Sequence, residues 1–216
     1  MARRERGRRA GLTREAILGA ALDLVDREGL KALSMRRLGA SLGVEAMALY
    51  HHVEGKEALL DGLVEHVFAQ PSSARPPEGR DWREWMRSYA DELLATLSAH
   101  PAVLPLVISR PAQTPRNHEA MEYALLALEE SGFEPSLALD AVYALNGLVI
   151  GHAIIAAAGE TGDAAAEPVD AAAYPRFAAA SRSGGGAAAR FEFALGALLD
   201  GFAAARSRSN RAAARS

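Results

Sequence analysis

A glycine separates two short helical patterns within residues 34–52, which read SMRRLGASLGVEAMALYHH. We expect one helix over Met35–Leu42 and a second over Glu45–His51. Gly43 lies where the chain must turn sharply, and glycine tolerates the positive φ that such a turn needs. Gly39 has almost no side chain, so a crossing helix can come close. The apolar skeleton of the two helices consists of Leu38, Leu42, Val44 and Leu49. This pattern is typical of a helix-turn-helix, whose second helix enters the major groove of DNA.

The rest of the chain predicts an all-α protein with about nine to ten helices in total. Alanine, the best helix former, supplies 47 of the 216 residues. The further expected helices are Thr13–Glu28, Lys56–Phe68, Asp81–Ala99, Ala102–Ser109, Asn117–Glu130, Pro135–Ala158 and Ala187–Ala205.

Composition divides the chain into two domains. An N-terminal three-helix bundle with the helix-turn-helix is expected over 11–70, after a basic disordered arm over 1–10. The Pro/Ser/Arg-rich residues 71–79 mark the boundary. A larger helical domain for ligand binding and dimerisation is expected over 80–206, and its Ala/Gly-rich segment 159–186 is predicted to be flexible, with a turn of helix near Phe177. A basic tail follows over 207–216.

Charge is distributed unevenly. Residues 1–40 hold ten Lys/Arg and five Asp/Glu, whereas residues 69–205 hold nine Lys/Arg and seventeen Asp/Glu. The basic part favours a polyanionic partner, because neutralised phosphates release counterions. The absence of cysteine excludes a disulfide scaffold, a thiol nucleophile and a Cys-ligated metal site. The first twelve residues contain no apolar run of a secretory signal, so a cytoplasmic location is expected.

Neither a membrane span nor a catalytic site is favoured. Residues 141–158 carry no formal charge, but Asp140, Asn146 and His152 favour a buried core or dimer helix over a membrane segment. No metalloprotease motif, phosphate-binding loop or nucleophile elbow is present, and the six histidines are scattered. We therefore expect no enzyme, no cofactor and no metal.

The run GLKALSMRRLGASLGVEAMALYHHVEGKEALLDGL resembles the DNA-binding domain of the TetR family of bacterial regulators. The resemblance covers residues 12–68, with Gly39 in place of the usual Ala. It continues through Asp81-Trp82, Ser131-Gly132-Phe133 and Ile150-Gly151, which resemble the effector domain of the tetracycline repressor. The resemblance implies an operator-binding homodimer that responds to a small ligand.

The resemblance also assigns DNA contacts. Arg36 is the expected base reader, because a guanidinium can grip guanine O6 and N7 together. Ala46 and Ala48 stand where the tetracycline repressor has Gln and Thr, His51 replaces a Trp and Glu54 replaces a Lys, so a different operator is implied. The expected phosphate contacts are Ser34, Arg37, Tyr50 and Lys56. The remaining candidates on this surface are Met35, Glu45, Met47 and His52, the last of which also suits packing at the corner of its helix.

A pocket between helices of the second domain is expected to bind a small apolar effector. Its polar candidates are Tyr89, Ser109, Tyr143 and Asn146, and its apolar candidates are Trp85, Leu93, Leu106, Met121, Leu125, Leu139 and Val142. Any one of these residues also suits a plain core. Leu106 and Ile155 match the His and Glu that help to hold magnesium in the tetracycline repressor, so magnesium–tetracycline is not the expected effector.

The sequence therefore predicts a dimeric repressor that a ligand releases from a near-palindromic operator. Residues 135–158 and 187–205 are the expected dimer helices, two of each forming a four-helix bundle. Two other classes stay open: an activator or nucleoid-type DNA-binding protein without an effector, and a helical metalloenzyme built on His and carboxylates.

Overall fold

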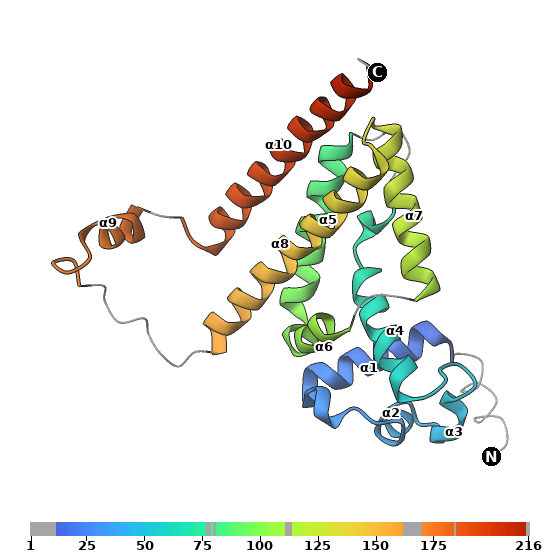
Figure 1. Ribbon diagram of the computed structural model, residues 1–216. Helices are drawn as coiled ribbons and strands as arrows, with labels where there is room; N and C mark the ends of the chain where they lie inside the picture. Colours follow the sequence, from blue (N-terminus) through green and yellow to red (C-terminus); the bar gives the residue numbers. More distant parts are fainter. Residues whose placement is uncertain are drawn as a thin grey trace.

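The computed structural model describes residues 12–76, 79, 81–110, 114–161, 170–183 and 185–214. Over these residues the protein contains ten α-helices and no strand, which confirms the predicted all-α class (Figure 1). The first four helices are α1 (Arg14–Glu28), α2 (Met35–Leu42), α3 (Ala46–Leu49) and α4 (Lys56–Phe68). The others are α5 (Trp82–Ala99), α6 (Leu104–Ser109), α7 (Pro115–Glu130), α8 (Pro135–Thr161), α9 (Pro175–Ser183) and α10 (Ala187–Ala213). The predicted arm over 1–10 lies outside the described residues.

Side-chain caps fix where the first helices begin. The Thr13 hydroxyl accepts a hydrogen bond from the Ala16 backbone N–H (3.1 Å) at the start of α1. The Ser34 hydroxyl accepts one from the Arg37 N–H (3.3 Å) at the start of α2. Gly43 ends α2 in the left-handed conformation with φ 66°, which satisfies the turn that the sequence predicts.

The N-terminal bundle is held by one continuous core. Helix α1 packs against α2 and α4, and α2 packs against α3. The side chains that fill the bundle are fully buried; the largest are Ile17, Leu18, Leu38, Leu49, Leu59 and Leu63. This packing presents α2 and α3 at one end of the molecule, and the C-terminus of α10 lies at the other (Figure 1).

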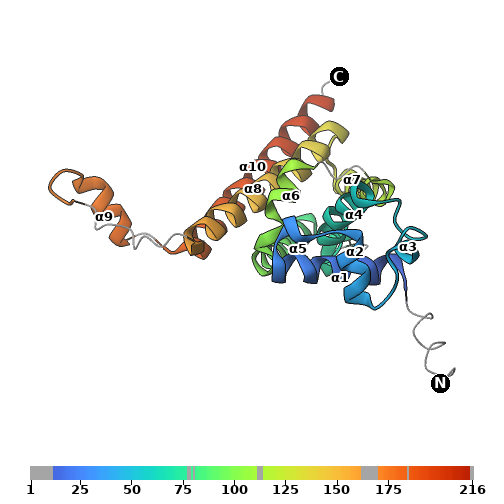
Figure 2. The same ribbon diagram turned by 90° about the horizontal axis from the view of Figure 1, so that it is seen from below.

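The second group of helices is built around α5 and α8. Helix α5 packs along α8, and α8 also contacts α7 and α10. The Trp82 ring meets the Phe133 ring edge-on, with 4.9 Å between centroids. Figure 2 shows α10 running along α8 on the side away from the N-terminal bundle.

Helix α8 is strongly apolar on more than one face. Its segment Pro135–Gly159 is long and apolar enough to cross a membrane, and 28% of its most apolar window is buried. The positions that enter the core recur at helical spacing, namely Ala138, Ala141, Val142, Leu145 and Val149. Other apolar positions stay outside, and the Ile155 side chain is 72% exposed. One face of α8 therefore serves the core of this chain, and another is available to a partner.

Three elements differ from the sequence-based expectations. Helix α10 continues to Ala213, because the alanine-rich sequence favours helix and Arg206 is anchored to the Ser131 carbonyl (2.8 Å). The turn of helix expected near Phe177 is present as α9, but α9 is longer than one turn and is preceded by a turn in which Asp170 accepts the Ala172 N–H (2.8 Å); residues 162–169 lie outside the described chain. The second helix of the helix-turn-helix is shorter than expected, covering only Ala46–Leu49.

Candidate functional site

The predicted DNA contacts divide into exposed and buried side chains. Arg36 and Arg37 are exposed on α2, whereas Met35 is 8% exposed and belongs to the core. Met35 was expected to contact DNA, but its side chain is buried in the core and is not available for a direct contact with DNA. Ser34 is half-buried because its hydroxyl caps α2. Arg37 forms an ion pair with Glu28 of α1 while its side chain stays 51% exposed.

Helix α3 presents small and apolar groups. Met47 is 72% exposed, and Ala46 and Ala48 beside it are half-buried. Glu45 is exposed at the residue before the helix. The side chains from 46 to 48 contain no hydrogen-bond donor, and their only acceptor is the weak thioether sulfur of Met47, so the base contacts expected of them are mainly apolar.

The loop after α3 gathers the polar candidates. The Tyr50 side chain is 46% exposed, and His51 and His52 are also exposed. Lys56 is exposed at the first position of α4, directly after Gly55, which adopts φ 115°. A lysine at a helix N-terminus combines its own charge with unpaired backbone N–H groups, which suits a phosphate.

Gly39 determines how closely α3 approaches α2. A Cβ atom at this position would lie 2.9 Å from the Val44 carbonyl oxygen and 3.2 Å from the Ala46 Cα. Both neighbours are backbone atoms of the turn and of α3. Helix α3 is therefore docked closer to α2 than an alanine at position 39 would allow.

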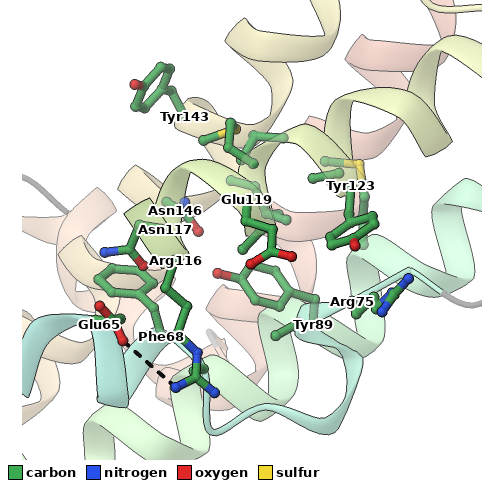
Figure 3. Close-up of a pocket in the computed structure, with 18 of the residues that line it drawn as sticks. Glu65, Phe68, Arg75, Tyr89, Arg116, Asn117, Glu119, Tyr123, Tyr143 and Asn146 are labelled. Carbon is green, nitrogen blue, oxygen red and sulfur yellow. Dashed lines mark ion pairs between the residues drawn. The ribbon is translucent and has the colours of Figure 1, made fainter. Parts of the chain in front are cut away.

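A cavity of about 570 Å³ lies among α4, α5, α7 and α8 (Figure 3). This volume is in the usual range for small-molecule pockets. Of the predicted ligand contacts, those that line it are Trp85, Tyr89, Met121, Val142, Tyr143 and Asn146. Burial raises the pKa of Tyr89, so its hydroxyl stays protonated and neutral.

Five predicted ligand contacts do not line this cavity: Leu93, Leu106, Ser109, Leu125 and Leu139. Leu93 and Leu106 are buried in the core, at 0% and 3% exposure. Ser109 and Leu139 are exposed on other faces of their helices. The apolar pattern in the sequence identifies side chains that are shielded from water. It does not show whether such a side chain lines a cavity or packs inside a filled core.

Sequence reasoning missed several lining residues. The principal ones are Glu65, Phe68, Arg75, Asn117, Glu119 and Tyr123. Asn117 had a detectable signal, because it lies four residues before the predicted contact Met121 and shares its helix face. Arg75 lies within the predicted linker 71–79 and had no such signal. Its guanidinium lies 4.0 Å from the centroid of the Tyr123 ring.

A buried carboxylate connects the cavity to α1. Arg14 donates from Nη1 to Glu65 Oε1 (2.6 Å) and from Nη2 to Oε2 (3.2 Å). Arg116 of α7 lies 3.8 Å from the same Oε1, as the dashed line in Figure 3 marks, and donates to Glu15 of α1 (3.3 Å). Burial acts to raise the pKa of Glu65, but hydrogen bonds from Arg14 and Thr114 outweigh it, so the net pKa is lowered and the group is ionised.

Two polar atoms at the cavity have no partner in the described protein. The Asn117 Nδ2 and the Asn146 Oδ1 are both buried without a hydrogen bond. The described residues contain no group of three or more His, Cys, Asp or Glu that could hold a metal ion. Ile155, one of the two positions compared with magnesium ligands, is also outside the cavity lining.

Sequence models of known families match both parts of the chain. Residues 17–63 match "Bacterial regulatory proteins, tetR family". Residues 75–206, more than half of the chain, match "Tetracyclin repressor-like, C-terminal domain". The chain belongs to the TetR family. The first match ends at residue 63, within α4, and the second begins at residue 75, before α5.

Relatives of this TetR-family chain are regulators. The HTH-type transcriptional repressor DrrR1 of Streptomyces coeruleorubidus is 36% identical over 153 residues, which cover 70% of this chain. The alignment spans only 56% of the length of DrrR1. Among solved structures, ActR of Streptomyces coelicolor in complex with actinorhodin is 27% identical with a TM-score of 0.72, covering 90% of this chain and 98% of ActR. A TetR variant of Acinetobacter baumannii in complex with minocycline is 28% identical with a TM-score of 0.69, at the same coverage.

Proposed function

We propose that this TetR-family protein is a transcriptional repressor that binds a near-palindromic operator as a homodimer and leaves it when a small molecule enters the cavity. The family, a relative named as a repressor and two neighbours described with small molecules support this function. We also propose that the protein is not an enzyme and that it acts in the cytoplasm.

One observation carries the proposal: helix α4 belongs to both sites. Its first residue, Lys56, is exposed beside the α3 loop, and its last residues, including Glu65 and Phe68, line the cavity. Ligand contacts at one end of a single rigid helix can therefore move the other end. The ligand shifts the balance between the two states only by the difference in its affinity for them.

Further ion pairs connect helices of the two domains. These contacts would transmit a movement caused by ligand binding to the DNA-binding helices. Arg110 at the end of α6 donates to Asp61 of α4 (2.6 Å) and also pairs with Glu57. His100 at the end of α5 lies 2.7 Å from an Asp26 carboxylate oxygen of α1. Helices α2 and α3, the reading helices that carry the predicted DNA contacts, are thus connected to the cavity through both α1 and α4.

The exposed apolar residues of α8 and α10 support a dimer. Tyr143 and Ile155 of α8 are 63% and 72% exposed, and Phe193 of α10 is 78% exposed. Isolated exposed apolar residues are common, but two adjacent helices with large exposed side chains favour a partner surface. Two copies of α8 and α10 would form a four-helix bundle, and the paired α3 helices would then read half-sites about 34–36 Å apart.

The test begins with selection of bound sequences from a random DNA duplex pool at near-physiological salt. An enriched palindrome supports a sequence-specific dimer, and loss of that complex on adding a ligand supports effector control. Retention without enrichment that falls steeply with salt would instead identify a nonspecific DNA-binding protein. A reporter gene behind the enriched operator separates repressor from activator by the sign of its response.

A further inference from the structure

We propose that the effector is a flat, uncharged aromatic molecule, bound without a metal ion, that offers a hydrogen-bond acceptor to Asn117 and a hydrogen-bond donor to Asn146. This inference rests on the proposed function and specifies its ligand. It specifies the small apolar effector expected from the sequence by giving it two polar groups.

The two asparagines supply the decisive observation. A buried polar group without a partner is costly, and such groups are rare in folded proteins. Here one unpaired donor, Asn117 Nδ2, and one unpaired acceptor, Asn146 Oδ1, both belong to residues that line the same cavity. Asn117 lies in the first turn of α7, where its backbone N–H bonds the Thr114 hydroxyl (3.3 Å). Asn146 lies in the middle of α8. A ligand that carries both complementary groups would satisfy both atoms.

The cavity walls indicate an aromatic ligand. The aromatic side chains of Phe68, Trp85, Tyr89 and Tyr123 line it from α4, α5 and α7, and the largely exposed Tyr143 of α8 also borders it; Figure 3 labels all of these except Trp85. Aromatic pairs prefer stacked or edge-to-face contacts with flat partners. Because the Tyr89 hydroxyl is neutral, it supplies a further polar contact without charge.

The charged residues around the cavity do not call for a charged ligand. Glu65 is neutralised by Arg14 and approached by Arg116. Arg110 is held by two carboxylates of α4, and Arg75 lies over the Tyr123 ring. An anionic ligand would have to break one of these pairs, whereas a neutral ligand leaves them in place. Glu119 also lines the cavity, but its side chain is exposed to water and so needs no cationic partner from a ligand. The lack of a metal-ligand cluster among the described residues favours direct binding of the organic molecule.

Four matched probes separate the two hydrogen bonds. Fluorene carries neither group, 9-fluorenone carries the acceptor, 2-hydroxyfluorene adds a hydroxyl, and 2-hydroxy-9-fluorenone carries both groups. Their affinities for the full-length protein are measured by equilibrium dialysis, with and without magnesium. The protein variants are Asn117→Leu and Asn146→Leu, with Asn210→Leu as a matched control, because Asn210 is exposed on α10 and outside the cavity lining.

We expect 2-hydroxy-9-fluorenone to bind the wild type most tightly. Asn117→Leu should remove the gain from the carbonyl, and Asn146→Leu the gain from the hydroxyl, each by about 3- to 10-fold. Asn210→Leu and magnesium should change nothing. Equal losses for all four probes in either variant would overturn the assignment of that asparagine. Failure of all four probes to bind the wild type would overturn the ligand class.

A second measurement does not depend on probe binding. Because each asparagine leaves a polar atom unpaired, replacing it with leucine should raise the melting temperature of the ligand-free protein. A lowered melting temperature in both variants would show that the two amides already stabilise the fold and are not reserved for a ligand. Neither measurement uses DNA, so a missing operator would refute the proposed function while leaving this result intact.

Discussion

At the scale of single residues, exposure and pairing support different roles for the neighbouring arginines Arg36 and Arg37. Arg37 forms an ion pair with Glu28, which fixes its position on the surface of the bundle. Arg36 is exposed at the preceding position of α2, and no ion pair with the described residues restrains it. A free guanidinium is the better base reader, whereas a tethered one suits a backbone contact.

Arg36→Ala should weaken binding to the selected operator by about 1–3 kcal/mol and relax preference at one base position. The measurement is competitive binding against operators substituted at each position. Unchanged selectivity with only a uniform loss of affinity would show that Arg36 contacts phosphate.

Lys56→Ala should weaken all duplexes by a similar factor and reduce the slope of log affinity against log salt by about one. The reason is that Lys56 offers a point charge at the start of α4 and no fork for a base. Titrations of operator and scrambled duplex at several salt concentrations measure both quantities. A loss confined to the operator would contradict the phosphate role.

His66 should make the protein less stable in mild acid. Burial lowers the pKa of His66, and the positive charge of Arg116 lowers it further. The folded state therefore favours neutral His66, and this contribution is full above the ordinary pKa of about 6.5 and declines as pH falls below it. Urea unfolding at pH 7.5 and 5.5 should show a smaller decline for His66→Gln than for the wild type. Identical declines would exclude His66 as a contributor.

At the scale of elements, glycine positions decide how the reading helix is docked. Gly39 allows α3 to lie against α2, because any side chain there would meet the backbone of Val44 and Ala46. Gly19 is also inside a helix, but a Cβ atom there would meet nothing within 4 Å. The two glycines thus form a natural pair of test and control.

Gly39→Ala should displace α3, reduce operator affinity and lower the free energy of unfolding by about 1–3 kcal/mol. Gly19→Ala should instead stabilise the protein by about 0.5–1 kcal/mol and leave operator binding unchanged. Chemical denaturation and operator titration of both variants supply the measurements. Wild-type operator affinity in Gly39→Ala would show that close docking of α3 is not required.

The positions of the helices could be predicted well from the sequence, whereas the contacts between helices could be predicted less well. Caps such as Thr13 and Ser34 and the turn glycine Gly43 are local signals, so the starts and ends of α1 and α2 could be predicted. The alanine-rich sequence favours the continuation of α10, but the hydrogen bond from Arg206 to the Ser131 carbonyl joins residues 75 positions apart and is not visible in any local pattern. The cavity depends on which apolar positions leave a gap when the helices pack together, and the unpaired atoms of Asn117 and Asn146 that line it belong to different helices.

At the scale of the whole molecule, the two ends of the chain have different surroundings. The helix-turn-helix lies at one end, and α10 carries its exposed arginines Arg208 and Arg211 to the other (Figure 1). Within one protomer these arginines are therefore far from the DNA surface, which argues against a role of this segment on the same DNA site. The face of α8 and α10 lies between the two ends and is where a second copy would set the spacing of the reading helices.

Deleting residues 187–216 should produce a monomer that binds the operator poorly, because two half-sites bind tightly only when one dimer engages both. The deletion also removes core residues such as Leu195 and Leu199, so a second variant must leave the fold intact. Phe193→Arg meets this need, because Phe193 is 78% exposed and makes no large contribution to the core. Sedimentation equilibrium should show both variants as monomers, and circular dichroism should show Phe193→Arg with wild-type helix content. A stable dimer in both would place the partner surface elsewhere, whereas a monomer that kept full operator affinity would refute the need for paired reading helices.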